Sequence, residues 1–286
     1  MPFRFVALNT VFLRQLASLG EGKAGWYRGT HMLGMFLVGP ALGARAISSL
    51  GFAWTYRLIS LAFLVTIVVS PIVFARYSPT PDPKRTSGWQ ALRSQLALLA
   101  RDRELRAVSL IESSTQAAGA FFVFFIVVMA VSLVHLSSAQ ASSLVAAKGS
   151  TFILALFVLG GLIKRLGQQR AYLLGFAAIA SALALLGFAN NAPLLWVGSL
   201  TLGLGLGAVQ IATLTRYAQI GARTGYGKVS GLSALVGPSG GMFGSLFGGL
   251  LGKWVGLPAT FSIAAAGFAV ALLALALPRR APLPTT

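Results

Sequence analysis

Residues 171–215 form one continuous stretch that contains no charged side chain. A helix needs about 20 apolar residues to cross the roughly 30 Å core of a bilayer, so this stretch is long enough for two crossings. Another uncharged stretch occupies residues 58–75, between Arg57 and Arg76. Charged residues make up only 10% of the chain, whereas soluble proteins carry about 25%. The sequence therefore predicts an integral membrane protein with several spans.

The apolar stretches predict helices rather than the strands of a membrane barrel. Backbone in lipid must satisfy its own hydrogen bonds, which only helices and closed barrels achieve. Barrel strands alternate apolar and polar residues, whereas the stretches in this chain are continuous. We therefore predict an all-α fold with about eight transmembrane helices. They cover residues 29–47, 58–75, 107–134, 139–163, 171–188, 193–215, 229–252 and 257–277. The first is short, and we expect Arg45 to extend it by reaching the bilayer surface.

The chain is strongly basic, with a formal net charge of +18. Most Lys and Arg residues fall in alternate loops and in the two terminal segments, whereas the opposite loops contain only Arg45, Arg57 and Lys253. This asymmetry follows the positive-inside rule, so we expect the basic loops and the C-terminus in the cytoplasm. The charge then needs no nucleic-acid partner. The expected location is an inner membrane of the bacterial type.

Few residues suit catalysis or metal binding. The chain has no cysteine, two histidines and five acidic residues. His31 and His135 lie near the ends of predicted spans on opposite sides, so they are not expected to share a metal ion. We therefore expect no metal, no cofactor and no enzymatic activity. A membrane-embedded enzyme is the third alternative, after the transport and scaffold functions considered below.

A polar segment at residues 76–106 separates the second and third predicted spans. Its first part, "SPTPDPK", is rich in proline, which removes a backbone donor and restricts the preceding residue. Helical periodicity then returns, with Trp89 and three leucines on one face, which predicts an amphipathic helix at the membrane surface. We therefore divide the chain into a partial N-terminal bundle at 1–75, a cytoplasmic linker at 76–106 and a six-helix bundle at 107–286.

A short internal repeat joins the two predicted bundles. "LVGPALG" at residues 37–43 recurs as "LVGPSGG" at residues 235–241, and each copy lies within a predicted span that follows a basic loop. Small residues let helices pack closely in a membrane. Repeats joined by a linker are common among secondary transporters. The helix-packing residues of the repeat are Gly39, Pro40, Gly43, Gly237, Pro238 and Gly241.

The stretch "GGLIKRLGQQR" at residues 160–170 resembles the loop signature of the major facilitator superfamily, roughly G-x-L-x-D-R-x-G-R-R-R. The matching residues are Gly160, Leu162, Arg165, Gly167 and Arg170. Lys164 stands where the family usually has an acidic residue, and two glutamines replace basic ones. "GPALG" at 39–43 also resembles the glycine–proline motif of the drug–proton antiporters in that family.

This resemblance implies a transporter that works by alternating access, with proton-driven export of a small organic solute as the favoured mode. Import or uniport by the same family is the second alternative, and a non-transporting membrane scaffold or remnant is another. Family members usually have twelve helices in two halves. Aligned with them, the chain would lack the first three helices and most of the fourth, through a misplaced start, a truncation or gene decay. The implied partners are a small-molecule substrate, protons and the lipid bilayer, and the expected state is a monomer.

Four polar residues inside the predicted spans are candidates for the transport pathway: Glu112, Gln116, Lys148 and Gln210. Ionisable groups in a membrane are costly and therefore suggest function. Simpler accounts stay open for each of them. Glu112 has Arg103 or Arg106 as an available partner, Lys148 can reach the outer surface, and the two glutamines can join helices by hydrogen bonds. Glu112 and Lys148 are expected at different depths, without a direct ion pair.

Overall fold

The computed structural model describes residues 2–19, 21–74 and 88–277, which are helical apart from short turns. The elements are α1 (Pro2–Leu19), α2 (Glu21–Leu33), the π-helical turn η1 (Gly34–Val38), α3 (Gly39–Phe74), α4 (Gly88–Arg101), α5 (Arg103–Leu133), α6 (Ser138–Leu166), α7 (Gln168–Gly187), α8 (Ala192–Thr224), α9 (Tyr226–Val255) and α10 (Leu257–Ala276). The predicted all-α class is confirmed. The amphipathic helix predicted after the proline-rich segment corresponds to α4; the proline-rich segment itself lies outside the described residues.

Seven segments in the described part of the chain are long and apolar enough to cross a membrane. They are Arg45–Val69, Arg103–Leu133, Ser138–Leu166, Gln168–Gly187, Ala192–Thr224, Tyr226–Val255 and Leu257–Ala276. The predicted span at 29–47 is not among them, although residues 29–47 are helical throughout, from α2 through η1 into α3. Six of the seven correspond to the spans predicted between residues 107 and 277. Their ends differ by at most four residues, except that Ala192–Thr224 continues nine residues past the predicted end at 215.

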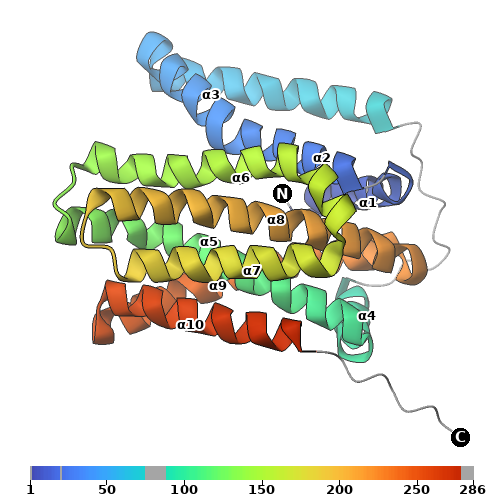
Figure 1. Cartoon of the computed structure of the whole chain (residues 1–286). Helices are drawn as coiled ribbons and strands as arrows, with labels where there is room; N and C mark the ends of the chain where they lie inside the picture. Colours follow the sequence, from blue (N-terminus) through green and yellow to red (C-terminus); the bar gives the residue numbers. More distant parts are fainter. Residues whose placement is uncertain (1, 20, 75–87, 278–286) are drawn as a thin grey trace, which may run out of the picture. The chain divides into compact units, whose positions relative to one another are not determined.

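The described chain forms two compact units, one made of Met1–Gly29 with Leu99–Thr286 and the other of Thr30–Leu98. In the second unit, Gly51 divides α3 into two helical parts with a φ of 76° and a ψ of 169°. Glycine tolerates this positive φ because it has no Cβ. Figure 1 shows the chain turning back on itself at that point. The boundaries predicted at residues 75 and 106 stay a prediction.

In the first unit, α5 to α10 lie side by side (Figure 1), and α8 packs against α5, α6, α7 and α9. Glycines bring these helices close together. A Cβ on Gly207 would lie 2.6 Å from the Cβ of Ala155 on α6, and one on Gly205 would lie 3.0 Å from that of Ala178 on α7. α8 is therefore the most enclosed helix of the bundle, and its polar residues face protein rather than lipid.

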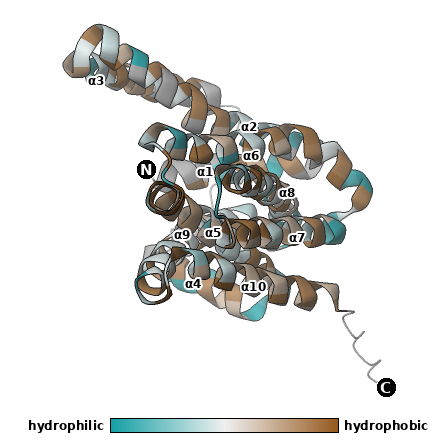
Figure 2. Ribbon diagram, turned by 60° about the vertical axis from the view of Figure 1, so that its left-hand side comes forward, coloured by the Kyte–Doolittle hydropathy of each residue, from teal (hydrophilic) through white to brown (hydrophobic). Residues whose placement is uncertain are grey.

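Helix starts and reversals follow local sequence. Asp102 caps α5, because its carboxylate accepts from the backbone N–H groups of Glu104 and Leu105 at 2.9 Å each. Gly167, with a φ of 82°, joins α6 to α7 in a single residue. Figure 2 shows that apolar residues, in brown, occur along all the helices. Many of their side chains are exposed, and that of Ile72 on α3 is 72% exposed. A bilayer accommodates such a surface, whereas water does not.

Candidate functional site

Glu112 is a carboxylate buried inside the six-helix bundle. It lies on α5 with only 6% of its surface exposed. Its position is eight residues after Glu104, about 12 Å further along the helix axis. A buried charge is costly unless hydrogen bonds or an opposite charge compensate it. The surroundings of Glu112 supply both.

Hydroxyl groups from two neighbouring helices contact this carboxylate. Ser233 Oγ on α9 donates to both Glu112 oxygens at 3.4 Å. The Tyr217 hydroxyl on α8 interacts with the Glu112 carboxylate and donates to Ser109 Oγ on α5 at 3.3 Å. Hydroxyls both donate and accept, so this arrangement suits either protonation state of Glu112.

Arg28 on α2 faces the same carboxylate. Its guanidinium interacts electrostatically with Glu112. Its Nε atom is buried and has no hydrogen-bond partner among the described residues. Close contact between Gly25 and the carbonyl group of Leu156 holds this part of α2 against α6. Glu112 and the oppositely charged Arg28 therefore belong to the same compact unit.

The two arginines considered from the sequence have other surroundings. Arg103 is exposed. Arg106 donates to the carbonyl oxygen of Ala100 at 3.2 Å. The partners that the structure gives Glu112 are instead Ser233, Tyr217 and Arg28.

Gln116 and Gln210 lie on the faces of α5 and α8 that carry the carboxylate cluster. Gln116 follows Glu112 by one turn, and the position of a Cβ on Gly237 of α9 would lie 4.0 Å from both side chains. Gln210 is buried seven residues before Tyr217, two turns away on the same face of α8. Polar groups thus continue along the bundle interior beyond Glu112.

Lys148 on α6 is half-buried rather than extended to an outer surface. Its Nζ lies 6.0 Å from the ring centroid of Phe122 and 3.9 Å from where a Cβ on Gly119 would be. Gly119 follows Gln116 by three residues on α5, so Lys148 is one turn beyond Gln116. Among the described residues, no carboxylate lies within ion-pair distance of Lys148.

An ion-pair network lies at the end of the bundle where α5 begins and α8 ends. Arg216 binds Glu104, and Arg223 binds Asp102 at 3.2 Å and Glu104 at 2.6 Å. These side chains are partly exposed, with 27% for Glu104 and 39% for Arg216. The network therefore connects two helix ends at a solvent-accessible surface.

The loop motif surrounds the junction of α6 and α7. Gly160 is buried, and Gly167 makes the reversal described above. The side chains of Leu162, Lys164, Arg165 and Arg170 are exposed. The neighbouring Gly161 has no other described atom within 4 Å of where its Cβ would be.

The second copy of the glycine–proline repeat lies on α9, against α5. The closest approach there involves Gly240 and Gly244, whose Cβ atoms would meet the backbone of Ser113 and Ala117. Gly241 makes only an ordinary contact with Ala120, and Pro238 is exposed. In the first copy, a Cβ on Gly39 would meet only the carbonyl group of Gly34, and Gly43 has open space around it. The side chain of Pro40 lies outside the described residues.

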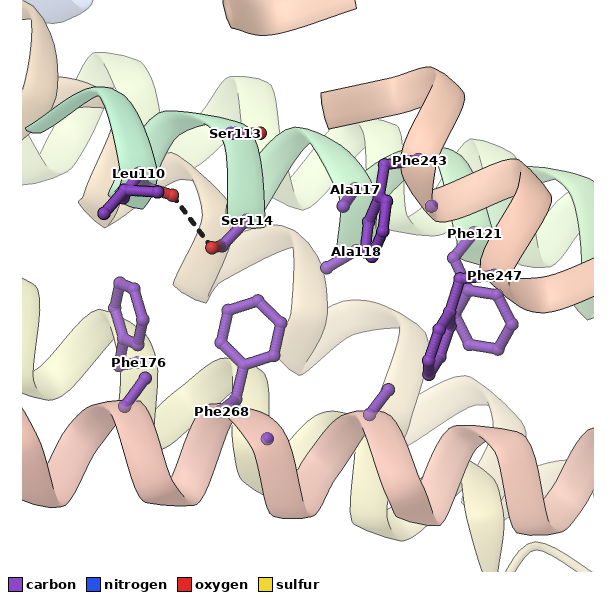
Figure 3. A pocket seen from close by; sticks show the side chains of 14 residues that line it. Leu110, Ser113, Ser114, Ala117, Ala118, Phe121, Phe176, Phe243, Phe247 and Phe268 are labelled. Carbon is purple, nitrogen blue, oxygen red and sulfur yellow. Dashed lines mark hydrogen bonds between the residues drawn. The ribbon is translucent and has the colours of Figure 1, made fainter. Parts of the chain in front are cut away.

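A separate apolar cavity of about 410 Å³ lies between α5, α7, α9 and α10. Figure 3 shows Phe121 and Phe247 at one end, Phe176 at the other and Phe268 between them. Its α5 residues face away from Glu112, and the hydroxyl of Ser114 donates to the Leu110 carbonyl of its own helix at 2.8 Å. This cavity has few free polar groups and is not part of the carboxylate cluster.

Sequence reasoning missed Arg28, Tyr217, Ser109 and Ser233. It treats Arg28 as a loop cation, and a lone serine or tyrosine in an apolar helix carries no distinctive signal. For the ion pairs at the end of the bundle the sequence did offer a sign, because it has few acidic residues. Two of them, Asp102 and Glu104, pair with the two arginines at the C-terminal end of α8.

Comparison with known proteins identifies similar sequences and folds. The family description "Major Facilitator Superfamily" matches residues 113–286, which is more than half of the chain. A crystal structure of a variant of the E. coli fucose:proton symporter FucP is similar, with a TM-score of 0.69 and 18% identity over 95% of this chain and 72% of that chain. A second structure, described as FucP in the outward conformation, has a TM-score of 0.64 and 16% identity over 95% and 71%. At these identities the likeness concerns the fold alone. No curated protein matches the sequence.

Proposed function

Because the chain belongs to the major facilitator superfamily, we propose that it is a proton-coupled transporter of a small organic solute, with Glu112 as the group that takes up and releases the proton. The family membership makes it a secondary transporter rather than an enzyme. The solute that it carries, the ion that drives transport and the direction of transport are our proposals.

The buried carboxylate of Glu112 carries the proposal. An ionisable group in a transmembrane helix is costly and is kept where it serves a pathway. The hydroxyls of Ser233 and Tyr217 stabilise both protonation states, and Arg28 favours the ionised one. A proton on Glu112 removes its attraction to Arg28, which changes the forces between α2 and α5. Such a change can couple proton binding to the rocking of two bundles against each other.

The solute class follows from the polar groups beyond Glu112. Gln116 and Gln210 each offer a donor and an acceptor, and Lys148 offers a cationic donor. They suit a small solute with hydroxyl, amide or anionic groups, in contrast to the apolar cavity on the other side of α5. Export by proton antiport is the favoured direction, supported by the resemblance of "GPALG" to the motif of drug–proton antiporters.

Proteoliposome flux tests this function. The chain is reconstituted with the pH-sensitive dye pyranine inside, a pH gradient is imposed, and ethidium, tetraphenylphosphonium or L-fucose is added in separate runs. We expect one of them to dissipate the gradient, and we expect Glu112→Gln to abolish this proton movement while solute exchange at equal pH continues. Ser114→Ala is the matched control, because Ser114 lies on the opposite face of α5.

Two results would contradict the proposal. The first is solute-driven proton movement that persists in Glu112→Gln. The second is folded protein that moves none of the three solutes with protons, which would favour the scaffold alternative.

A further inference from the structure

Three buried hydroxyl oxygens inside the bundle lack a hydrogen-bond partner of normal geometry among the described residues. They are Tyr172 Oη on α7, Thr213 Oγ1 on α8 and Ser230 Oγ on α9. Buried polar atoms are nearly always paired, with protein or with ordered water. Two of them, Tyr172 Oη and Thr213 Oγ1, lie close together on neighbouring helices, which indicates a hydrated polar region inside the bundle.

Tyr172 lies between the buried carboxylate and the surface ion pair. It interacts electrostatically with Glu112, with Glu104 and with Arg216, and its hydroxyl lies close to that of Thr213. On α5, Glu104 and Glu112 are separated by about 12 Å along the helix axis. About four hydrogen bonds of roughly 2.8 Å in series bridge that distance.

These groups and Tyr217, which contacts Glu112 directly, make up what we call the hydroxyl relay: Tyr172, Thr213 and Tyr217. We propose that the hydroxyl relay, bridged by water, carries protons between the solvent-accessible end of the bundle at Glu104 and the Glu112 carboxylate. The relay rests on the proposed function, since it supplies the proton that Glu112 binds.

The transfer is balanced at each step. A hydronium ion at the Glu104 end donates a proton to the first hydroxyl oxygen of the relay and becomes water, while that hydroxyl passes its own proton onward. The last hydroxyl, Tyr217, donates to the ionised carboxylate, so Glu112 becomes a neutral carboxylic acid and every hydroxyl ends with one proton. Release follows the same path in reverse.

Charged and titratable groups on three other helices interact with Glu112. Arg28 faces it from α2, Tyr217 from α8 and Tyr172 from α7, while α9 contributes the neutral Ser233. Arg216 holds Glu104 in its ion pair at the outer end. The relay hydroxyls are positioning residues for proton movement and need not contact the solute.

An infrared pH-jump experiment on the reconstituted chain, without any solute, tests the relay. The signal is the C=O band of a protonated carboxyl group, and its loss in Glu112→Gln assigns it. We expect Tyr172→Phe and Thr213→Val to slow the appearance of this band by roughly 100-fold, the low end of what a positioned proton donor contributes. The final amplitude should stay unchanged, because the substitutions affect the path and leave the carboxylate in place.

Tyr226→Phe is the matched control, since Tyr226 packs against Gly221 near the same end of the bundle without belonging to the relay. Equal rates in the unsubstituted protein and both relay variants would overturn the relay and leave the proposed function intact. The same slowing in Tyr226→Phe would overturn it as well. A missing Glu112 band in the unsubstituted protein would contradict the proposed function itself, and with it the relay.

Discussion

Two adjacent glycines on α9, Gly240 and Gly241, should respond differently to substitution by alanine. A Cβ on Gly240 would meet the backbone of Ser113, with the Cα atom only 2.8 Å away and the carbonyl carbon 2.9 Å away. Backbone atoms cannot rotate aside, so α5 and α9 would have to separate. A Cβ on Gly241 would lie 3.7 Å from that of Ala120, an ordinary contact.

The magnitude follows from a comparison of the two alanine variants. Both gain about 1 kcal/mol from the better helix propensity of alanine. Only Gly240→Ala has the overpacking cost, typically about 1–3 kcal/mol. The two variants should therefore differ by about 1–3 kcal/mol, which corresponds to roughly 2–12 °C in Tm for a chain of this size.

Thermal unfolding in detergent, followed by intrinsic tryptophan fluorescence, measures this difference. Gly241→Ala should unfold at or slightly above the temperature of the unsubstituted protein, and Gly240→Ala clearly below Gly241→Ala. Equal midpoints for the two variants would refute the close α5–α9 packing on which the site depends, because both glycines occupy the same helix and differ only in what they face.

Three further predictions concern orientation, the loop motif and Lys148. Reporter fusions after Leu166 should give a cytoplasmic signal and fusions after Asn190 a periplasmic one; the reverse would overturn the orientation taken from the charge asymmetry. Lys164→Asp should restore the acidic position of the loop motif and shift the protein towards closure of its cytoplasmic side, seen as lower labelling of a cysteine placed there, and unchanged labelling would argue against this. Lys148→Met should stabilise the bundle, by at most about 2.5–3.5 kcal/mol, the insertion cost of a lysine at mid-helix, because Lys148 has no carboxylate partner among the described residues. A lower unfolding midpoint for Lys148→Met would contradict that account.

Much of the fold was predictable from the sequence because the bilayer imposes a simple rule on it. The uncharged stretch at 171–215 had to cross the membrane as helix, and the same reasoning located the other helices between residues 107 and 277. The span predicted at 29–47 is not among the seven apolar segments, although the backbone there is helical, with a local π turn, and Gly51 interrupts α3 only beyond it. Local backbone geometry of that kind has little effect on hydropathy.

The candidate site was predictable only in part. Glu112 stood out because a carboxylate within an apolar helix is rare and costly. Its partners did not, since Ser233 lies 121 positions away in the sequence and Arg28 belongs to a segment that reads as a basic loop. Hydrogen bonds between residues so far apart in the sequence depend on which helices are neighbours. Hydropathy cannot identify those neighbours, because equally apolar helices have the same hydropathy in every arrangement.

By itself, then, the sequence determined that the chain is a membrane protein, that it is helical, and the number of its spans to within one. These properties follow from the free-energy cost of placing unpaired polar groups in lipid. Each segment avoids that cost by itself, by forming a helix. The tertiary structure alone decided that α8 lies at the centre, that glycines bring α5 and α9 into contact, and that Tyr217, Ser233 and Arg28 converge on Glu112. Those features depend on packing between helices, where small side chains and hydrogen bonds, and not hydrophobicity, select the neighbours.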